Sequence, residues 1–284
     1  MQVFLNGQFL NKEDAKVSVF DRGFLFGDGV YEVIPVYANK MFRFHEHIVR
    51  LENSLNAIHI NNPYNQSEWQ NICQDLIKVS QSGDNKALYI QVTRGVSERQ
   101  HLYEDTMVPT VFVMCNKIYS RPFDEGVGAI IHEDIRWHRC DIKAITLLPN
   151  ILLRQLAKDT GGAYEAILIR DNKVTEGAAS NVFIVKGTSV YTPPKDGSIL
   201  PGITRDLLVE LLRDSGQLVY EEAISLEALK DADEVWLTGS TTGVAPVIQI
   251  DGISVGNGKP GGLWKSANNI FNAYIEKIKK SPSE

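Results

Sequence analysis

The order of strand-like and helix-like segments is the feature that most limits the folds open to this chain of 284 residues. At the N-terminus, Asn6-Gly7 separates two short β runs, and this pair supplies the positive φ angles of a type I′ hairpin turn. Apolar residues recur at helical spacing between residues 45 and 58. The elements expected in this half are a hairpin over 3–10, strands near 30–37, 87–93 and 110–116, a helix over 45–58, and a helix after Ser67, an N-cap candidate.

The second half mixes strands and helices in the same way. Pro149 is placed for the first turn of a helix, where its missing N–H costs nothing. The elements expected here are helices over 149–159, from about Thr204 and over 262–278, and strands near 164–169, 181–186 and 189–192. There is no doubly wound dinucleotide fingerprint, so the pattern predicts an α+β protein.

The length favours two domains, each with its own core. Residues 118–127 carry few core residues and are predicted to link a smaller N-terminal α/β domain, 1–117, to a larger C-terminal domain, 128–284. The net charge of −6 argues against a nucleic-acid surface. There is no apolar run of membrane-spanning length and no cleavable signal pattern. Three cysteines without metal-like spacing indicate reduced thiols in a cytoplasmic protein, and scattered histidines such as His45 and His47 indicate no metal site.

Two short segments carry the chemistry. Cys140-Asp141-Ile142-Lys143 offers a lysine, and Thr175-Glu176-Gly177-Ala178-Ala179-Ser180-Asn181 offers a carboxylate among small residues. A pyridoxal phosphate enzyme needs such a pair, because an amine holds the aldehyde and a carboxylate keeps the pyridine nitrogen protonated. Spacing alone also permits a surface lysine and a solvated turn carboxylate.

The sequence of these segments resembles that of the class IV (fold type IV) pyridoxal phosphate-dependent aminotransferases and, within them, the D-amino acid aminotransferases. The similarity runs from the N-terminal hairpin to about Ile278. It is carried by D-R-G at 21–23, G-D-G-V-Y-E at 27–32, R-x-H at 99–101, D-I-K at 141–143, T-E-G-x-x-S-N at 175–181, L-P-G-I-T-R at 200–205 and S-T-T at 240–242. The resemblance implies a two-domain fold type IV enzyme whose larger domain holds the cofactor.

The resemblance also implies the roles of the two central residues. Lys143 would hold pyridoxal 5′-phosphate covalently and then move the substrate proton. Glu176 would pair with the pyridine nitrogen, so that negative charge can flow into the ring. Ser180 and Asn181 would orient the segment that carries Glu176.

Several pieces would hold the cofactor phosphate. Arg50 matches the family's phosphate-binding arginine, although its i,i+4 spacing from Glu46 equally permits a surface salt bridge. The helix that begins near Ile203 and Thr204 offers free N–H groups to an anion. Ser240 and Thr241 lie in a turn that can form a second anion site, and Leu200 would pack on the ring.

The substrate pocket decides the subfamily. Tyr31, Arg99 and His101 would form the clamp for the substrate α-carboxylate. In the family the Arg and His come from the neighbouring subunit, which implies a homodimer. The side on which the carboxylate is anchored selects the hand of the substrate, so the R-x-H motif favours D-amino acids.

The predicted reaction passes the amino group of D-alanine, or a related D-amino acid, to 2-oxoglutarate, giving pyruvate and D-glutamate. Its partners are small D-amino acids and 2-oxo acids. A branched-chain L-amino acid or (R)-amine transaminase is an alternative, which would not need Arg99 and His101. A pyruvate-releasing lyase resembling aminodeoxychorismate lyase is a second, and a cofactor-binding protein without turnover is a third.

Overall fold

The computed structural model describes residues 1–80, 83, 85–118 and 122–281. Within them, contacts group residues 1–118, 142–146 and 281 into a first unit and residues 122–141 and 147–280 into a second. The short segment 142–146, which the predicted division assigns to the C-terminal domain, therefore makes its contacts with the N-terminal elements. The predicted linker, 118–127, includes residues 119–121, which lie outside the described residues.

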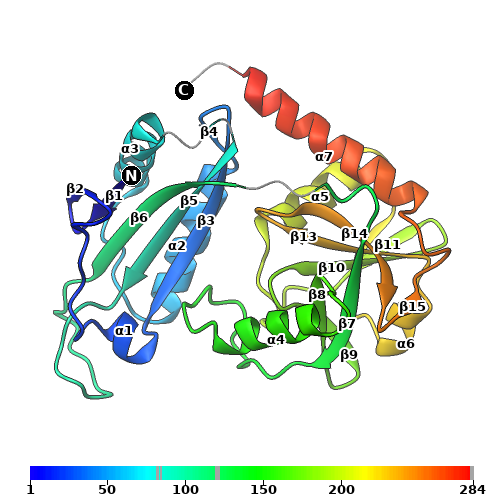
Figure 1. Ribbon diagram of the computed structural model, residues 1–284, viewed down its shortest axis with the longest axis horizontal. Helices are drawn as coiled ribbons and strands as arrows, with labels where there is room; N and C mark the ends of the chain where they lie inside the picture. Colours follow the sequence, from blue (N-terminus) through cyan, green and yellow to red (C-terminus); the bar gives the residue numbers. More distant parts are fainter. Residues whose placement is uncertain (81–82, 84, 119–121, 282–284) are drawn as a thin grey trace. The chain divides into compact units, whose positions relative to one another are not determined.

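The first unit contains one antiparallel sheet and its helices (Figure 1). Its strands follow the order β2-β1-β6-β5-β3-β4. The elements in chain order are β1 (Gln2–Leu5), β2 (Gln8–Asn11), α1 (Arg22–Phe26), β3 (Gly29–Tyr37), β4 (Lys40–Met41), α2 (Phe44–Ala57), α3 (Gln66–Val79), β5 (Asn85–Thr93) and β6 (Thr110–Lys117).

Local sequence explains the turns and ends of these elements. Asn6 and Gly7 have φ angles of 47° and 88°, so the predicted turn between β1 and β2 is confirmed. The expected cap of α3 is wrong by two residues. Asn65, not Ser67, caps the helix: its side chain accepts from the Glu68 N–H, and the Glu68 side chain accepts from the Asn65 N–H. This reciprocal pair satisfies two donors that a helix start otherwise leaves unpaired.

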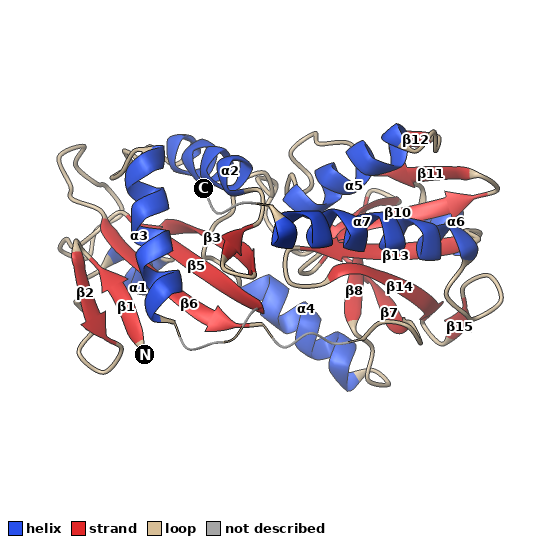
Figure 2. Cartoon of the chain, turned by 90° about the horizontal axis from the view of Figure 1, so that it is seen from above, coloured by secondary structure: helices blue, strands red, loops and turns tan. Residues whose placement is uncertain are grey.

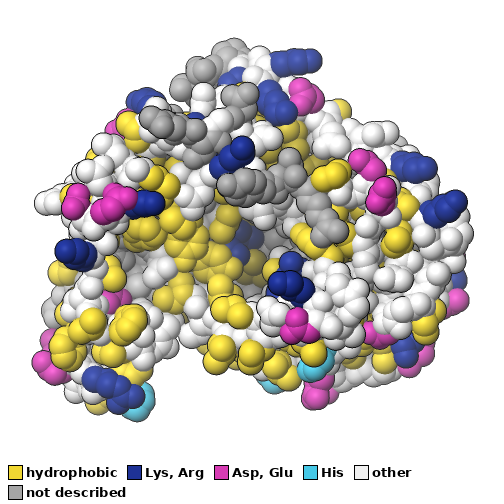
Figure 3. Space-filling view, in the orientation of Figure 1, with side chains coloured by type: hydrophobic (Ala, Val, Ile, Leu, Met, Phe, Trp, Pro, Cys, Tyr) yellow, Lys and Arg dark blue, Asp and Glu magenta, His cyan; other side chains and the backbone are white. Residues whose placement is uncertain are grey.

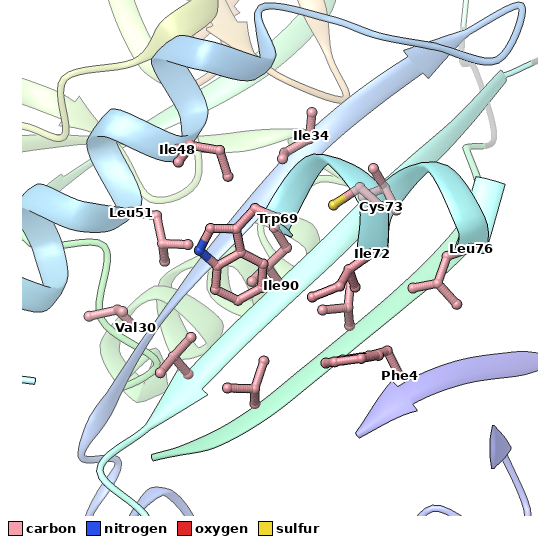
Figure 4. Packing of buried hydrophobic residues seen from close by; sticks show 14 of the residues in the cluster. Phe4, Val30, Ile34, Ile48, Leu51, Trp69, Ile72, Cys73, Leu76 and Ile90 are labelled. Carbon is pink, nitrogen blue, oxygen red and sulfur yellow. The ribbon is translucent and has the colours of Figure 1, made fainter. Parts of the chain in front are cut away.

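Helices α2 and α3 cover one face of this sheet and form a core with it (Figure 4). Alternate residues of the strands point to this face, and the helices present residues three or four apart. Trp69 is fully buried between the helices and the sheet, and its ring packs edge-on against Tyr64. The buried set shown in Figure 4 includes Phe4, Val30, Ile34, Ile48, Leu51, Ile72, Cys73, Leu76 and Ile90.

The second unit contains a larger mixed sheet. Its strands follow the order β12-β11-β10-β13-β14-β7-β8-β9, with β15 beside β14, and β7 runs parallel to both of its neighbours. Helices α5 and α7 lie side by side along it (Figure 2). The elements are β7 (Val127–Glu133), α4 (Leu148–Asp159), β8 (Glu165–Arg170), β9 (Lys173–Gly177), β10 (Asn181–Lys186), β11 (Ser189–Thr192), α5 (Ile203–Asp214), β12 (Val219–Glu221), α6 (Leu226–Lys230), β13 (Glu234–Gly239), β14 (Gly243–Ile250), β15 (Ile253–Ser254) and α7 (Gly262–Lys280).

The start of α7 is fixed by a single carboxylate. Glu234, the first residue of β13, accepts from the backbone N–H groups of Leu263 and Trp264 at 3.0 and 2.8 Å. It also accepts from the indole of Trp236 at 3.0 Å. A carboxylate at this end also complements the helix dipole, so β13 and α7 are joined by charge as well as by packing.

The α+β prediction is confirmed by these two sheets with their covering helices. The predicted strands and helices correspond to observed elements whose ends differ by a few residues. Strands β13 and β14, which form the middle of the larger sheet, were not predicted. In the part of the chain that the structure describes, no helix is both long and apolar enough to span a bilayer.

Candidate active site

Lys143 lies in a short extended segment beside the start of β3. The Tyr31 N–H donates to the Lys143 carbonyl at 2.9 Å, and the Lys143 N–H donates to the Ser54 hydroxyl of α2 at 3.1 Å. An isolated bridge between Val30 and Ala144 continues the pairing. The Lys143 Nζ lies 4.2 Å from the centre of the Tyr31 ring. The amine is therefore presented from a backbone held on both sides, and it rests against an aromatic face.

Arg50 is not in a surface salt bridge with Glu46, which pairs instead with Arg43 at 2.7 Å. Arg50 is buried and donates to both oxygens of Glu32, from Nε at 2.7 Å and from Nη2 at 2.9 Å. Glu32 lies on the same face of β3 as the core residues Val30 and Ile34, and this face is covered by α2. Placing the guanidinium on a fully buried carboxylate fixes the direction in which Arg50 points.

His47, one turn before Arg50, completes this cluster with its Nδ1 2.8 Å from Glu32. Burial alone would raise the pKa of Glu32, but Arg50 and His47 together hold it far below the ordinary value. Burial lowers the pKa of His47. The His47 Nε2 is buried and has no hydrogen-bond partner among the described residues.

Glu32→Gln is expected to destabilise the protein by about 3–5 kcal/mol at neutral pH, because it leaves the Arg50 charge buried without its counter-ion. The folded pKa of Glu32 lies below the unfolded value. This stabilisation is therefore complete above the unfolded pKa of about 4.5 and is lost as pH falls toward the folded one. Denaturant unfolding at pH 7 and at about pH 3 should show a smaller difference between wild type and variant at the lower pH. The exposed Glu13→Gln serves as the control, and a pH-independent difference would contradict the assignment.

Glu176 lies one residue before the end of β9 in the second unit and is held by three donors. Arg136 Nη1 lies 2.5 Å from one of its oxygens, and the other oxygen accepts from Asn181 Nδ2 and the Leu200 N–H, each at 3.0 Å. Burial raises the pKa of Glu176 to about 7, against the opposing effect of Arg136. All three neighbours donate, so the pattern suits a carboxylate rather than a carboxylic acid.

A second carboxylate fixes Arg136 in place. Asp134 accepts from Arg136 Nε and Nη2 at 2.9 Å each, from the Thr175 hydroxyl at 2.9 Å and from Arg170 at 3.0 Å. Burial would raise the pKa of Asp134, but Arg136 and Thr175 hold it below its ordinary value. This network connects Thr175, the residue before Glu176, to Arg136, which contacts Glu176. The Glu176 carboxylate therefore has little freedom to turn.

A buried acid, Glu165, holds the segment after Glu176 through hydrogen bonds. Glu165 accepts from the Ser180 hydroxyl at 2.9 Å and from the Ala179 N–H at 3.2 Å. Asn181, which opens β10, donates from the same amide to the Leu200 carbonyl at 2.9 Å. The predicted orienting roles of Ser180 and Asn181 correspond to these bonds, and Asn181 brings the Leu200 segment to Glu176.

The predicted anion sites lie in the same unit as Glu176. Gly202 caps α5 without a side-chain bond, and Ile203 and Thr204 are the first residues of the helix, where N–H groups have no intrahelical acceptor. The Thr204 hydroxyl is buried and unpaired among the described residues, as is that of Thr238 at the end of β13. These orphaned donors fit a phosphate, which has acceptor oxygens to offer.

The β10–β13 pairing explains why the two anion sites occur together. Asn181 pairs with Thr238 across the two strands. Ser240 and Thr241 form the turn that follows, before β14 begins at Gly243. A Cβ on Gly202 would meet the Asn181 amide at 1.9 Å, so only glycine permits this approach of the α5 start to β10.

The three residues predicted to bind the substrate carboxylate all lie in the first unit, but they do not share the same neighbours. Tyr31 contacts Lys143 and packs with its ring 5.7 Å from that of Tyr89. Arg99 and His101 lie on an exposed loop and both contact the Phe26 ring, at 5.4 and 5.7 Å. The contacts of this chain thus bring Arg99 and His101 together but give Tyr31 different neighbours.

Sequence reasoning missed Arg136, Glu32 and the buried position of His47. The signal was present for two of them, since Arg136 lies in the I-H-E-D-I-R-W-H-R-C-D-I-K run and Glu32 closes G-D-G-V-Y-E. Among the described residues, no group of three or more potential ligands could hold a metal ion.

Comparisons with known proteins agree with this fold and these motifs. The family model described as "Amino-transferase class IV" matches residues 29–250, and the chain belongs to this family. It is 41% identical over 278 residues to a D-alanine aminotransferase of Staphylococcus haemolyticus, covering 97% of this chain and 98% of that one.

Two solved structures share the fold. The branched-chain amino acid aminotransferase of Escherichia coli is 27% identical with a TM-score of 0.89, over 96% of this chain and 94% of that chain. A hypothetical aminotransferase from Mycobacterium tuberculosis, in its PLP-bound form, is 23% identical with a TM-score of 0.85, over 98% and 99% of the two chains. The fold type IV prediction is confirmed by these likenesses.

Proposed function

We propose that this chain is a pyridoxal 5′-phosphate-dependent D-amino acid aminotransferase that converts D-alanine and 2-oxoglutarate to pyruvate and D-glutamate. The observation that carries the proposal is the R-x-H loop of Arg99 and His101, because a guanidinium and an imidazole side by side suit a substrate carboxylate. The 41% identity to a D-alanine aminotransferase over nearly the whole chain supports the same substrate class.

Lys143 supplies the amine that holds the cofactor aldehyde and carries the proton to and from the substrate Cα. Its position suits both tasks. The backbone of Lys143 is bonded to Tyr31 and Ser54, so motion is confined to the four-carbon side chain. When bound, the cofactor supplies an electron sink for the carbanion that proton removal creates. Tyr31 limits the space around the amine and offers a phenol to the substrate carboxylate.

Glu176 would hold the proton on the pyridine nitrogen, and the three donors that contact its oxygens favour the charged form that this role needs. Ile203 and Thr204 would donate to the phosphate from the start of α5, Ser240 and Thr241 would donate from the β13–β14 turn, and Arg50 would balance its charge. Leu200 would pack on the ring, and its backbone N–H holds Glu176. The chain thus presents donors for a phosphate and an acceptor, the Glu176 carboxylate, for a protonated pyridine nitrogen.

The enzyme is proposed to act as a homodimer in which Arg99 and His101 serve the neighbouring subunit. One face of α4 supports an association surface. Leu148, Ile151, Leu152 and Leu156 recur at helical spacing and are each at least 41% exposed, and Figure 3 shows apolar side chains at the surface over this helix. The three free cysteines, all buried, support a reducing cytoplasm as its compartment.

The test is a titration of the cofactor-loaded protein, following its visible absorbance with D-alanine and, separately, with L-leucine. D-alanine should bleach the absorbance, and 2-oxoglutarate should restore it. Bleaching by L-leucine alone would replace the proposal with a branched-chain activity, like that of the E. coli structural neighbour. Release of pyruvate without consumption of an amino acceptor would identify a lyase instead.

A further inference from the structure

Two buried arginines share one carboxylate in the first unit. Asp28 accepts from Arg22 Nε at 2.8 Å and from Arg94 Nε and Nη2 at 2.8 and 3.0 Å. Arg22 and Arg94 are 4% and 6% exposed. A cluster with two cations and one anion is costly to bury, so its remaining donors need strong acceptors.

Those acceptors lie on the backbone of the R-x-H loop. Arg22 Nη1 donates to the Gln100 carbonyl at 2.6 Å and to the Leu102 carbonyl at 3.5 Å, and Nη2 donates to the His101 carbonyl at 3.2 Å. One planar guanidinium thus holds three consecutive carbonyls of the loop and, through Nε, the Asp28 carboxylate. A lysine could not make this forked set of bonds.

Arg94 anchors the other side of the cluster. It donates to the carbonyls of Ile58 and His59 at 2.6 and 3.0 Å, just after the end of α2, and its guanidinium lies 3.7 Å from the centre of the Tyr103 ring. The loop is therefore tied through Asp28 and the two arginines to the helix that carries Arg50.

Burial of its own side chains contributes little to the shape of this loop. Arg99, Gln100 and His101 are exposed, and Leu102 is 81% exposed, so burial of side chains does not fix them. The same Phe26 ring that contacts Arg99 and His101 also lies under Arg22, at 4.8 Å.

We propose that Arg22, held by Asp28 and Arg94, is a positioning residue that sets the Arg99–His101 loop for the substrate carboxylate. The inference rests on the proposed function, because it takes Arg99 and His101 as the carboxylate-binding pair. Arg22 itself touches neither substrate nor cofactor in this assignment and acts only through the loop backbone. Its loss should therefore weaken binding of carboxylate substrates more than it slows the chemical step.

The test compares R22K with R99Q and with the double variant as holoenzymes. R22K should raise the KM for D-alanine about tenfold while kcat changes by less than about threefold. In R22K/R99Q the KM should be no higher than in R99Q alone, because both changes remove one function. An R22K KM within about twofold of wild type, or additive effects in the double variant, would overturn the inference. R213K, at a half-exposed arginine paired with Glu221 in the second unit, is the matched control.

A second readout does not depend on the substrate. Arg99 is a trypsin site within the loop, so the rate of cleavage after Arg99 reports how well the loop is held. R22K should be cut there several-fold faster than wild type and R213K, and an unchanged rate would overturn the inference. If R99Q leaves the KM unchanged while R22K accelerates cleavage, the proposed carboxylate-binding role fails and the anchoring by Arg22 stands.

Discussion

Lys143→Ala should lower the rate of D-alanine transamination by at least about a thousandfold, which is the largest effect expected from any single change in this chain. In the proposed function the side chain supplies both the covalent link to the cofactor and the base that moves the substrate proton. Its backbone bonds to Tyr31 and Ser54 do not involve the side chain, so the fold should survive the substitution. Single-turnover measurements of product formation with D-alanine would give the rate.

A chemical measurement separates loss of the link from loss of the fold. Borohydride reduction of the cofactor-loaded wild type should add the cofactor mass to the peptide that contains Lys143. In Lys143→Ala no peptide should gain that mass, although phosphate contacts should still retain the cofactor. Lys186→Ala, at an exposed lysine paired with Asp231, should behave like wild type. Labelling of another lysine in the wild type would contradict the assignment.

Local sequence patterns located the elements that begin and end with distinctive residues. The Asn6-Gly7 hairpin and the α4 helix with Pro149 near its start were predictable because turn and cap chemistry acts over a few residues. Strands β13 and β14 were not, because each contains four consecutive buried residues and so shows little alternation of apolar and polar positions. Pro246 within β14 further argued against a central strand.

The candidate site shows the same limit at the level of side chains. The candidate residues Lys143 and Glu176 could be proposed from the sequence because their neighbours in the motifs distinguish them. Their supporting charges were not, because Glu32 meets Arg50 across 18 positions and Arg136 meets Glu176 across 40. A buried charge looks like any surface charge in a sequence, and only the fold shows which partner makes its burial possible. The i,i+4 spacing of Glu46 and Arg50 suggested a wrong partner for this reason.

Glu176→Gln should lower kcat for D-alanine by about a hundredfold to a thousandfold while the protein still binds the cofactor. A neutral amide cannot balance the charge of a protonated pyridine nitrogen, so the ring becomes a poorer acceptor of electrons. Glutamine also fits its surroundings badly. Glu176 receives donors on both oxygens, from Arg136 on one and from Asn181 and the Leu200 N–H on the other. The amide NH₂ of glutamine would therefore face at least one donor.

A second variant, Glu176→Asp, separates the effect of the charge at this position from the effect of where the carboxylate lies. Aspartate keeps the negative charge but is shorter by one methylene, so it should retain more activity than glutamine and less than wild type. Steady-state kcat with D-alanine, measured with saturating cofactor, gives the order directly. Glu222→Gln, at an exposed acid of the same unit, controls for the loss of one charge. Equal activity of Glu176→Gln and wild type would show that Glu176 does not act on the ring. The buried Asp134–Arg136 network would then serve only to allow a carboxylate in the core of the second unit.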